Sequence, residues 1–221
     1  MKKTVRIICI ICLTLITPLV FSCSCKKDEL SSAVSQIRSD IFKGSGEKYS
    51  VEIYSEEKEF PFINDRFVGE KKSCLVVKIK DCFEKNLTVT LSYDGKNYSS
   101  PLSYLNASNS LTATVLVHKF PVSSIDVTLS SESGNDSFTA SSVKKSDAIS
   151  PLTALKSVSK SEKDFVSSLY IDGVFSCEIY IRLLAEGDYN FYYVGFAQGD
   201  NKITAFLLDG QSGEIIAGKT T

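Results

Sequence analysis

Between residues 48 and 140, apolar and polar positions alternate with a period of two in a series of short runs. This period places apolar side chains on one face of a strand and polar side chains on the other. The runs centre on residues 49–53, 75–79, 87–93, 98, 111–117, 125–129 and 138–140. Asp94-Gly95 and Gly134-Asn135 are typical of tight hairpin turns. The pattern therefore predicts short antiparallel strands, each with one face in a core and one in water.

Two antiparallel sheets packed face to face would bury the apolar faces of these strands together. The arrangement resembles an immunoglobulin-like antiparallel β-sandwich over residues 48–140, without the tryptophan and cysteine pattern of antibody domains. Residues 56–73 and 99–110 interrupt the alternation and carry aromatic side chains. These two segments either present a contact surface on loops or cover the ends of the sandwich.

Residues 23–47 are predicted to form a short polar tether followed by a helix. Apolar residues recur there at intervals of three or four, at Leu30, Val34, Ile37 and Ile41. Asp28 is a candidate cap for the start of this helix, and Gly44 and Gly46 mark its end. We expect its narrow apolar stripe to pack on the domain that follows, and a stalk is the alternative.

The alternation changes after residues 141–150, a serine-rich segment predicted to be a linker. Ser150 and Pro151 are typical of a helix start, and helical spacing continues to residue 169. Alternating runs then follow at residues 175–183, 189–196, 202–208 and 214–217. Residues 151–221 are therefore predicted to be an α+β domain in which helices precede a four-stranded antiparallel meander. The chain as a whole is expected to be mainly β.

Three segments near the C-terminus carry a short family motif. They are Tyr192 to Phe196, Ala205 to Asp209, and Ser212 to Ile216. In strand order and in an Asp-x-x-Thr-Gly-Glu turn, where Ser212 replaces the threonine, this region resembles a PepSY-like domain. PepSY domains are found in protease propeptides and cell-surface proteins. The resemblance implies binding or inhibition more readily than catalysis.

The first 22 residues have the pattern of an export signal. Lys2, Lys3 and Arg6 form a cationic start, and residues 7–21 are almost wholly apolar. This run of 15 residues contains Pro18 and is shorter than the roughly 20 residues that span a bilayer. A cleaved signal peptide is therefore favoured over a permanent transmembrane helix.

The end of this leader predicts where the mature chain begins. Val20 stands three residues before Cys23, and Ser22 stands directly before it. This pattern resembles the lipobox of bacterial lipoproteins, with Phe21 in place of the usual smaller residue. The resemblance implies that Cys23 is the first mature residue and carries the lipid, and two acyl chains hold a protein firmly on a membrane. The alternative is a plain secretory signal in which Cys23 has no special role.

Charge and cysteine content exclude several classes of protein. The leader holds three of the 25 basic residues and none of the 26 acidic ones, which leaves 22 against 26 in the mature chain. Because both signs are interspersed, no basic face predicts nucleic-acid binding. Only Cys74, Cys82 and Cys177 fall in the folded part, too few for a disulfide framework. We expect them to be buried free thiols.

No motif commits the chain to a reaction. His118 is the single histidine, and the alternation of residues 111–117 places it on a solvated face, so no catalytic residue, metal site or cofactor is predicted. Two groups of acidic residues remain, at Glu56, Glu57 and Glu59 and at Asp188, Asp200 and Asp209. Both groups are predicted to be solvated surface.

Together these patterns predict a lipid-anchored binding or interaction protein on the extracytoplasmic face of a bacterial cell membrane. Its partners would be the membrane, through Cys23, and an envelope protein, a protease or a glycan. The alternative is a protease inhibitor or regulator that acts through the C-terminal domain.

Overall fold

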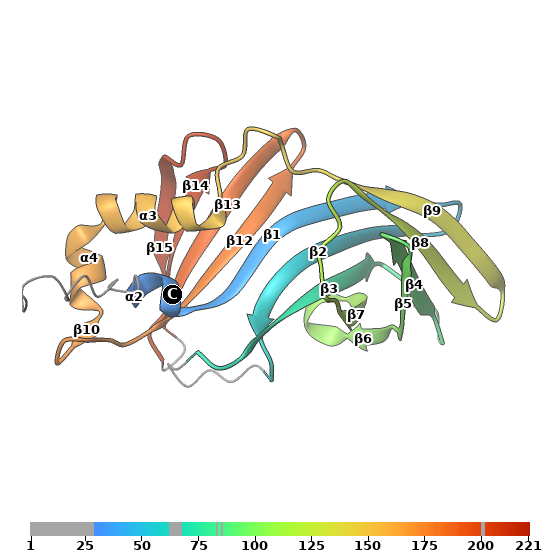
Figure 1. The fold of residues 1–221 in the computed structure, drawn as a ribbon, viewed down its shortest axis with the longest axis horizontal. Coiled ribbons are helices and arrows are strands. Elements are labelled where there is room, and N and C mark those ends of the chain that lie inside the picture. Colours follow the sequence, from blue (N-terminus) through green and yellow to red (C-terminus); the bar gives the residue numbers. More distant parts are fainter. Residues whose placement is uncertain (1–28, 62–67, 83, 85, 200–201) are drawn as a thin grey trace, which may run out of the picture.

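The computed structural model describes residues 29–61, 68–82, 84, 86–199 and 202–221. The structure is mainly antiparallel β, with few helices (Figure 1). The helices are α2 (Glu29–Ser32), the 3-10 turn η1 (Asn106–Ser108), α3 (Pro151–Ser161) and α4 (Lys163–Ser168). The leader, Cys23 and Asp200 lie outside the described residues. The predictions that concern them therefore stay predictions.

The strands form one large sheet and one small hairpin. The first nine strands are β1 (Val34–Ser45), β2 (Ser50–Glu59), β3 (Lys71–Lys80), β4 (Thr88–Tyr93), β5 (Lys96–Pro101), β6 (Ser103–Leu105), β7 (Ser110–Leu116), β8 (Ser124–Ser131) and β9 (Gly134–Ser142). The remaining strands are β10 (Tyr170–Ile171), β11 (Val174–Phe175), β12 (Glu178–Glu186), β13 (Tyr189–Ala197), β14 (Ile203–Asp209) and β15 (Ile215–Thr220). The large sheet has the order β15-β14-β13-β12-β1-β2-β3-β7-β6, and β10 pairs only with β11.

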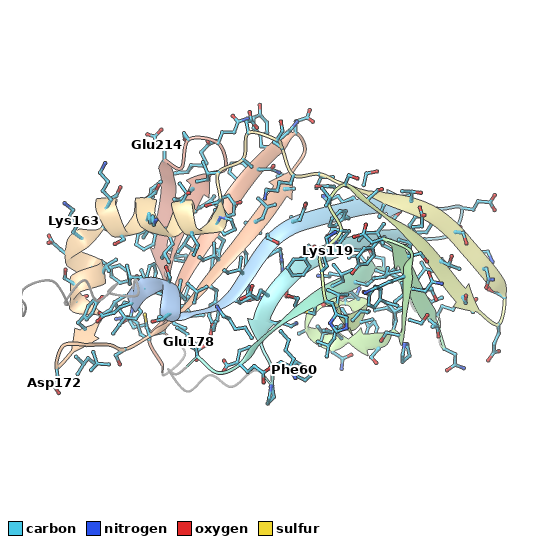
Figure 2. All side chains as sticks on the ribbon, in the orientation of Figure 1. Phe60, Lys119, Lys163, Asp172, Glu178 and Glu214 are labelled. Atoms are coloured by element: carbon cyan, nitrogen blue, oxygen red, sulfur yellow. The ribbon has the colours of Figure 1, made fainter. Side chains whose placement is uncertain are left out.

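Strands β12 to β15 form an antiparallel meander with α3 and α4 on one face (Figures 1 and 2). The side chain of Ser150 accepts a hydrogen bond from Thr153 N, and Pro151 occupies the first turn of α3. This helix buries Leu155 and Val158 in a core with Ile181 and other apolar residues of the meander. The predicted helices and four-stranded meander are therefore confirmed.

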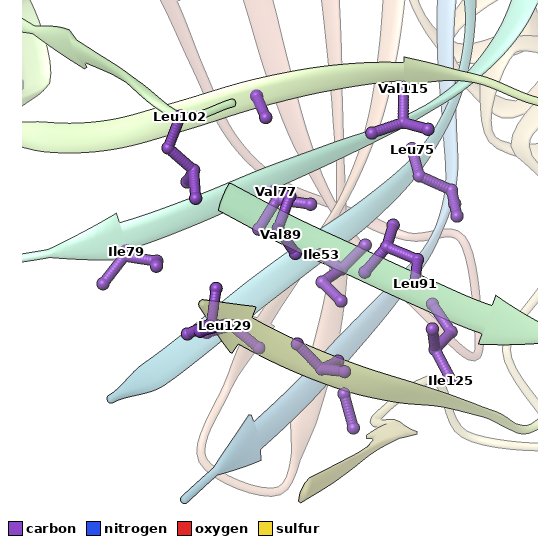
Figure 3. Packing of buried hydrophobic residues seen from close by; sticks show 14 of the residues in the cluster. Ile53, Leu75, Val77, Ile79, Val89, Leu91, Leu102, Val115, Ile125 and Leu129 are labelled. Atoms are coloured by element: carbon purple, nitrogen blue, oxygen red, sulfur yellow. The ribbon is translucent and has the colours of Figure 1, made fainter. Parts of the chain in front are cut away.

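The other half of the sheet curls over a second core (Figure 3). Leu75 on β3 and Ile53 on β2 pack in one cluster with Leu91 on β4 and Leu129 on β8. Strand β8 pairs with β4 and β9, and the end of β9 pairs with β1 at Phe42, which closes the curl. The alternating runs of residues 48–140 thus form strands with one buried face, as the period of two predicts.

The predicted helix of residues 30–41 is wrong, because most of this segment is strand β1. Only Glu29–Ser32 forms a helical turn. Strand β1 runs parallel to β12 and antiparallel to β2. The register shifts twice, between Val34 and Gln36 and between Arg38 and Asp40. The first shift lengthens the spacing between the apolar residues Val34 and Ile37 from two to three, which imitates a helical pattern.

Strand β1 also joins the two cores. Val34 and Ile41 belong to the core under α3, and Phe42 belongs to the core of the curled half. Residues 141–150, predicted as a linker, are hydrogen-bonded to both halves. Val143 N donates to Ile41 O, and Ile149 N donates to Gly210 O. A single continuous sheet thus connects both cores.

Candidate binding face

The face of the sheet opposite α3 carries a group of charged and aromatic side chains from β1, β2 and β12. Paired residues of neighbouring strands place their side chains on the same face. Gln36 is paired with Tyr180 and Lys58, and Arg38 is paired with Arg182 and Glu56. We call this surface the open face, and it consists of Gln36, Arg38, Tyr54, Glu56, Lys58, Tyr180 and Arg182.

Glu56 is the centre of the open face, and its side chain is only 3 % exposed. Its Oε1 accepts hydrogen bonds from Arg38, with Nε at 2.9 Å and Nη2 at 2.8 Å. Its Oε2 accepts a hydrogen bond from Gln36 Nε2 at 2.9 Å and lies 3.7 Å from Lys58 Nζ. The prediction of a solvated surface is therefore wrong for Glu56, because pairing with β1 brings the half-buried Arg38 to it.

Arg182 extends the network to β12. Its Nε and Nη2 donate to Gln36 Oε1 at 2.9 and 2.6 Å. The guanidinium lies 5.5 Å from the ring centroid of Tyr180 and 6.0 Å from that of Tyr193. None of the ion pairs among the described residues involves Arg182. Burial, and then the neighbouring Arg38, lower the pKa of Arg182, so positive charge is concentrated here.

Two further carboxylates are buried at the edge of the open face. Glu59 Oε1 accepts a hydrogen bond from Gly69 N at 2.6 Å, and its Oε2 is buried without a hydrogen-bond partner. Glu178 is fully buried, and Tyr180 donates to it at 3.4 Å. Burial, and then Glu178, raise the pKa of Tyr180 to about 12. Glu59 thus also departs from the predicted solvated surface, whereas Glu57 is 44 % exposed.

A groove of about 350 Å³ adjoins the open face. Its apolar side chains come mainly from the meander, with Leu184, Phe191 and Leu207, while Ile41 comes from β1. The charged side comes from β1, β2 and β3, with Arg38, Lys43, Glu52 and Lys80 beside Tyr54. Glu186 of β12 also lines the groove, so a largely apolar wall with one acid lies opposite a wall that holds three cations and one acid.

The charged wall of the groove is itself ordered by hydrogen bonds. Tyr54 donates to Glu52 at 2.7 Å, and Lys43 and Lys80 lie 3.5 and 3.8 Å from the same carboxylate. Burial alone would raise the pKa of Glu52, but the Tyr54 hydrogen bond and the two lysines together lower it. Burial and Glu52 raise the pKa of Tyr54, which keeps the phenol protonated as a donor. The Arg38 guanidinium lies 3.8 Å above the Tyr54 ring.

The cysteines and the histidine fall where the sequence places them. Cys74 and Cys177 are buried free thiols, and Cys82 is partly buried. Burial raises the pKa of Cys74 to about 11 and that of Cys177 to about 12, so both are protonated near neutral pH. His118 is exposed. The described residues contain no group of side chains suited to hold a metal ion.

The open face could not have been found from sequence spacing alone. The sequence pattern predicts that the alternation is interrupted from residue 56 onward, a segment that includes Glu56 and Glu59. In the structure, strand β2 continues to Glu59. Asp188 lies in a turn at the surface, as predicted, whereas Asp209 is the last residue of β14 and is partly buried. Asp209 Oδ1 accepts hydrogen bonds from Gln211 N, Ser212 N and the Ser212 hydroxyl.

Comparisons of the chain with protein-family models, with curated proteins and with solved structures found no match. Within the described residues, no helix has the length and apolar character needed to cross a membrane.

Proposed function

We propose that the protein is a lipid-anchored binding protein on the extracytoplasmic face of a bacterial cell membrane, and that it binds its ligand in the groove beside the open face. The leader of residues 1–22 and the position of Cys23 support the anchor. The observation that carries the binding site is a pair of neighbouring half-buried arginines, of which Arg38 is hydrogen-bonded to Glu56 and Arg182 to Gln36.

A buried charge network is a poor device for stability, which favours a role in binding. Removing charges from water costs free energy that their attraction often fails to offset. Arg182 has no ion-pair partner among the described residues and lies beside Arg38, which lines the groove. Arg38, Lys43 and Lys80 together make the groove suited to attract an anionic group. The groove volume of about 350 Å³ falls within the range of small-ligand sites. We expect a ligand that combines an apolar group, against Phe191 and Leu207, with a carboxylate or phosphate.

The finer assignments of fold belong to the same proposal. We infer that residues 48–140 are an immunoglobulin-like sandwich, supported by the shared core between β2-β3 and β4-β8. We infer that residues 151–221 are PepSY-like, supported by the helices, the consecutive meander and the Asp209 turn. Both assignments are typical of proteins that bind rather than catalyse.

Site-specific photocrosslinking tests the binding site in living cells. A benzophenone amino acid would replace Phe191 in the groove and, as the control, Val122, which is 79 % exposed and lies in the connection between β7 and β8. We expect one reproducible adduct from position 191 that is absent from position 122 and is lost with Arg38→Ala. Identical adducts from both positions, or none from position 191, would contradict the proposal.

Regulation of a protease is the second candidate, and the edge strand β15 favours it. Among the described strands, β15 pairs with β14 alone, and its residues after Ile215 are exposed. An open edge can add a strand from another protein. Titrating the mature chain, residues 23–221, against secreted proteases of the same organism should then slow substrate cleavage, and Ile216→Asp should weaken the effect. Unchanged cleavage rates would exclude this function.

A further inference from the structure

The hairpin β10–β11 presents two large apolar side chains to solvent. Ile171 and Val174 are paired across the hairpin and are 58 % and 65 % exposed. Asp172 and Gly173 connect them with φ values of 51° and 78°, as in a tight type I′ turn. Asp172 lies at the outer end of the molecule (Figure 2). Two adjacent apolar side chains therefore flank a projecting tip.

The base of this hairpin is fixed to the protein. The rings of Tyr170 and Phe175 meet edge to face with centroids 5.3 Å apart, and Phe175 packs against the core under α3. Ser176 N donates to Leu169 O at 3.0 Å. The exposure of Ile171 and Val174 thus belongs to an ordered element with a defined direction.

The described chain begins beside this hairpin. Glu29 and Ser32 of α2 line a hollow of about 450 Å³ together with Val174 and Phe175. Only residues 24–28 separate Glu29 from Cys23. At about 3.5 Å per residue, this tether reaches at most ~20 Å. A lipid on Cys23 would therefore hold the hairpin close to the membrane surface.

Cationic side chains lie at the same end of the molecule. Lys156, Lys160 and Lys163 line a second hollow with Leu30 of α2. Long lysine side chains reach toward headgroup phosphates while their stems stay on apolar surface. Glu162, between α3 and α4, and Asp164 on α4 offset part of this charge. We therefore expect apolar contact, more than charge, to determine what binds at this end of the molecule.

We propose that the β10–β11 hairpin inserts Ile171 and Val174 into the interfacial region of the bilayer, which rests on the proposed lipid anchor at Cys23. Apolar side chains on an element held at the membrane enter the boundary between headgroups and acyl chains. The anchor and the hairpin would then fix two points of the molecule, so the protein would keep one orientation on the membrane.

Tryptophan fluorescence tests this contact, because the natural chain contains no tryptophan. Val174→Trp places a single reporter at the tip. Tyr189→Trp is the matched control, because Tyr189 is 69 % exposed and begins β13 at the β12–β13 turn. The mature chain purified from membranes would be reconstituted in vesicles of phosphatidylethanolamine and phosphatidylglycerol, with and without brominated acyl chains.

We expect Val174→Trp emission to shift to shorter wavelength on vesicles and to be quenched by the brominated lipid, while Tyr189→Trp emission is unchanged. No quenching at position 174, or equal quenching at both positions, would overturn the insertion. A shift that grows with protein concentration without vesicles would assign the surface to a second copy and would also overturn it. The intact mass of the same sample reports the lipid on Cys23 separately, so an anchored but unquenched protein refutes only the hairpin contact. A chain without lipid refutes the anchor. The hairpin contact can then still be tested with excess vesicles, because quenching at position 174 reports insertion whether or not the chain carries a lipid.

Discussion

Glu56 connects side chains from β1 and β2 through one buried carboxylate. Its partners Arg38 and Gln36 lie 18 and 20 residues away in sequence, and Gln36 in turn accepts from Arg182, 146 residues away. The sequence marks Glu56 only as one of several neighbouring acids, so its burial could not be predicted. By contrast, the exposure of His118 follows from short-range alternation, and the structure confirms it. The expected burial is confirmed for Cys74 and Cys177, whereas Cys82 is only partly buried.

We expect Glu56→Gln to destabilise the protein by about 2–3 kcal/mol, because it leaves the cations around it without a buried counter-charge. The side chains of Arg38 and Lys58 are 16 % and 23 % exposed, so water can still solvate their charges. This solvation limits the loss of stability to the value given. Urea denaturation measures the change. The control Glu57→Gln removes one exposed ion pair with Lys71 and should cost at most ~1 kcal/mol. Equal losses for both variants would contradict the proposed network.

The titration of the Asp209 carboxyl group provides a test at the scale of a single residue. Hydrogen bonds from Ser212 N, Gln211 N and the Ser212 hydroxyl lower the pKa of this carboxyl. Because the folded pKa lies below the unfolded one, the stabilisation is present above the unfolded pKa and is lost as pH falls through the folded value. Carbon NMR titration should give a pKa below the ordinary 3.8, and Ser212→Ala should raise it toward that value. An unshifted carboxyl in the natural chain would show that the turn does not hold these bonds in solution.

At the scale of elements, β1 shows why local pattern and tertiary structure disagree. Its two register shifts disturb the period of two, and of its neighbours only β2 follows it directly, whereas β9 and β12 come from distant parts of the chain. The strands of the meander were predictable because each pairs with the next one along the chain. A strand buried between distant partners carries no such local signal.

The side chain of Asp136 connects β9 to the turn between β1 and β2. We expect Asp136→Ala to lower the free energy of unfolding by about 2 kcal/mol. Its buried carboxylate accepts hydrogen bonds from Glu47 N, Lys48 N and Tyr49 N, at 3.1, 2.9 and 3.1 Å, in the turn between β1 and β2. The control Asp126→Ala removes one hydrogen bond from Thr139 on an exposed face and should cost ~0.5 kcal/mol or less. Thermal unfolding compares the two. If Asp136→Ala behaves like the control, the carboxylate does not fix the turn.

At the scale of the whole molecule, the sheet runs without interruption through both cores. β1 contributes Phe42 to one core and Val34 to the other, while residues 143–149 bond to both halves. The two regions predicted as separate domains thus share a central strand. Local unfolding around one core would therefore break strand pairs of β1 that also stabilise the other core.

Cooperative unfolding of both halves follows from this shared strand. We expect native-state hydrogen exchange to give the central amides of β4 and β13 the same opening free energy. Phe42→Ala should lower both values together, although its side chain lies in only one core. Separate opening of residues 151–221, with β4 still protected, would show instead two independent folding units.

We propose that the whole molecule is attached to a membrane through Cys23, and the intact mass of the protein from the membrane fraction tests this attachment. We expect a chain that begins at Cys23 and carries the added mass of the acyl chains. A chain in the soluble cytosolic fraction that still contains Met1 and the apolar leader would contradict it.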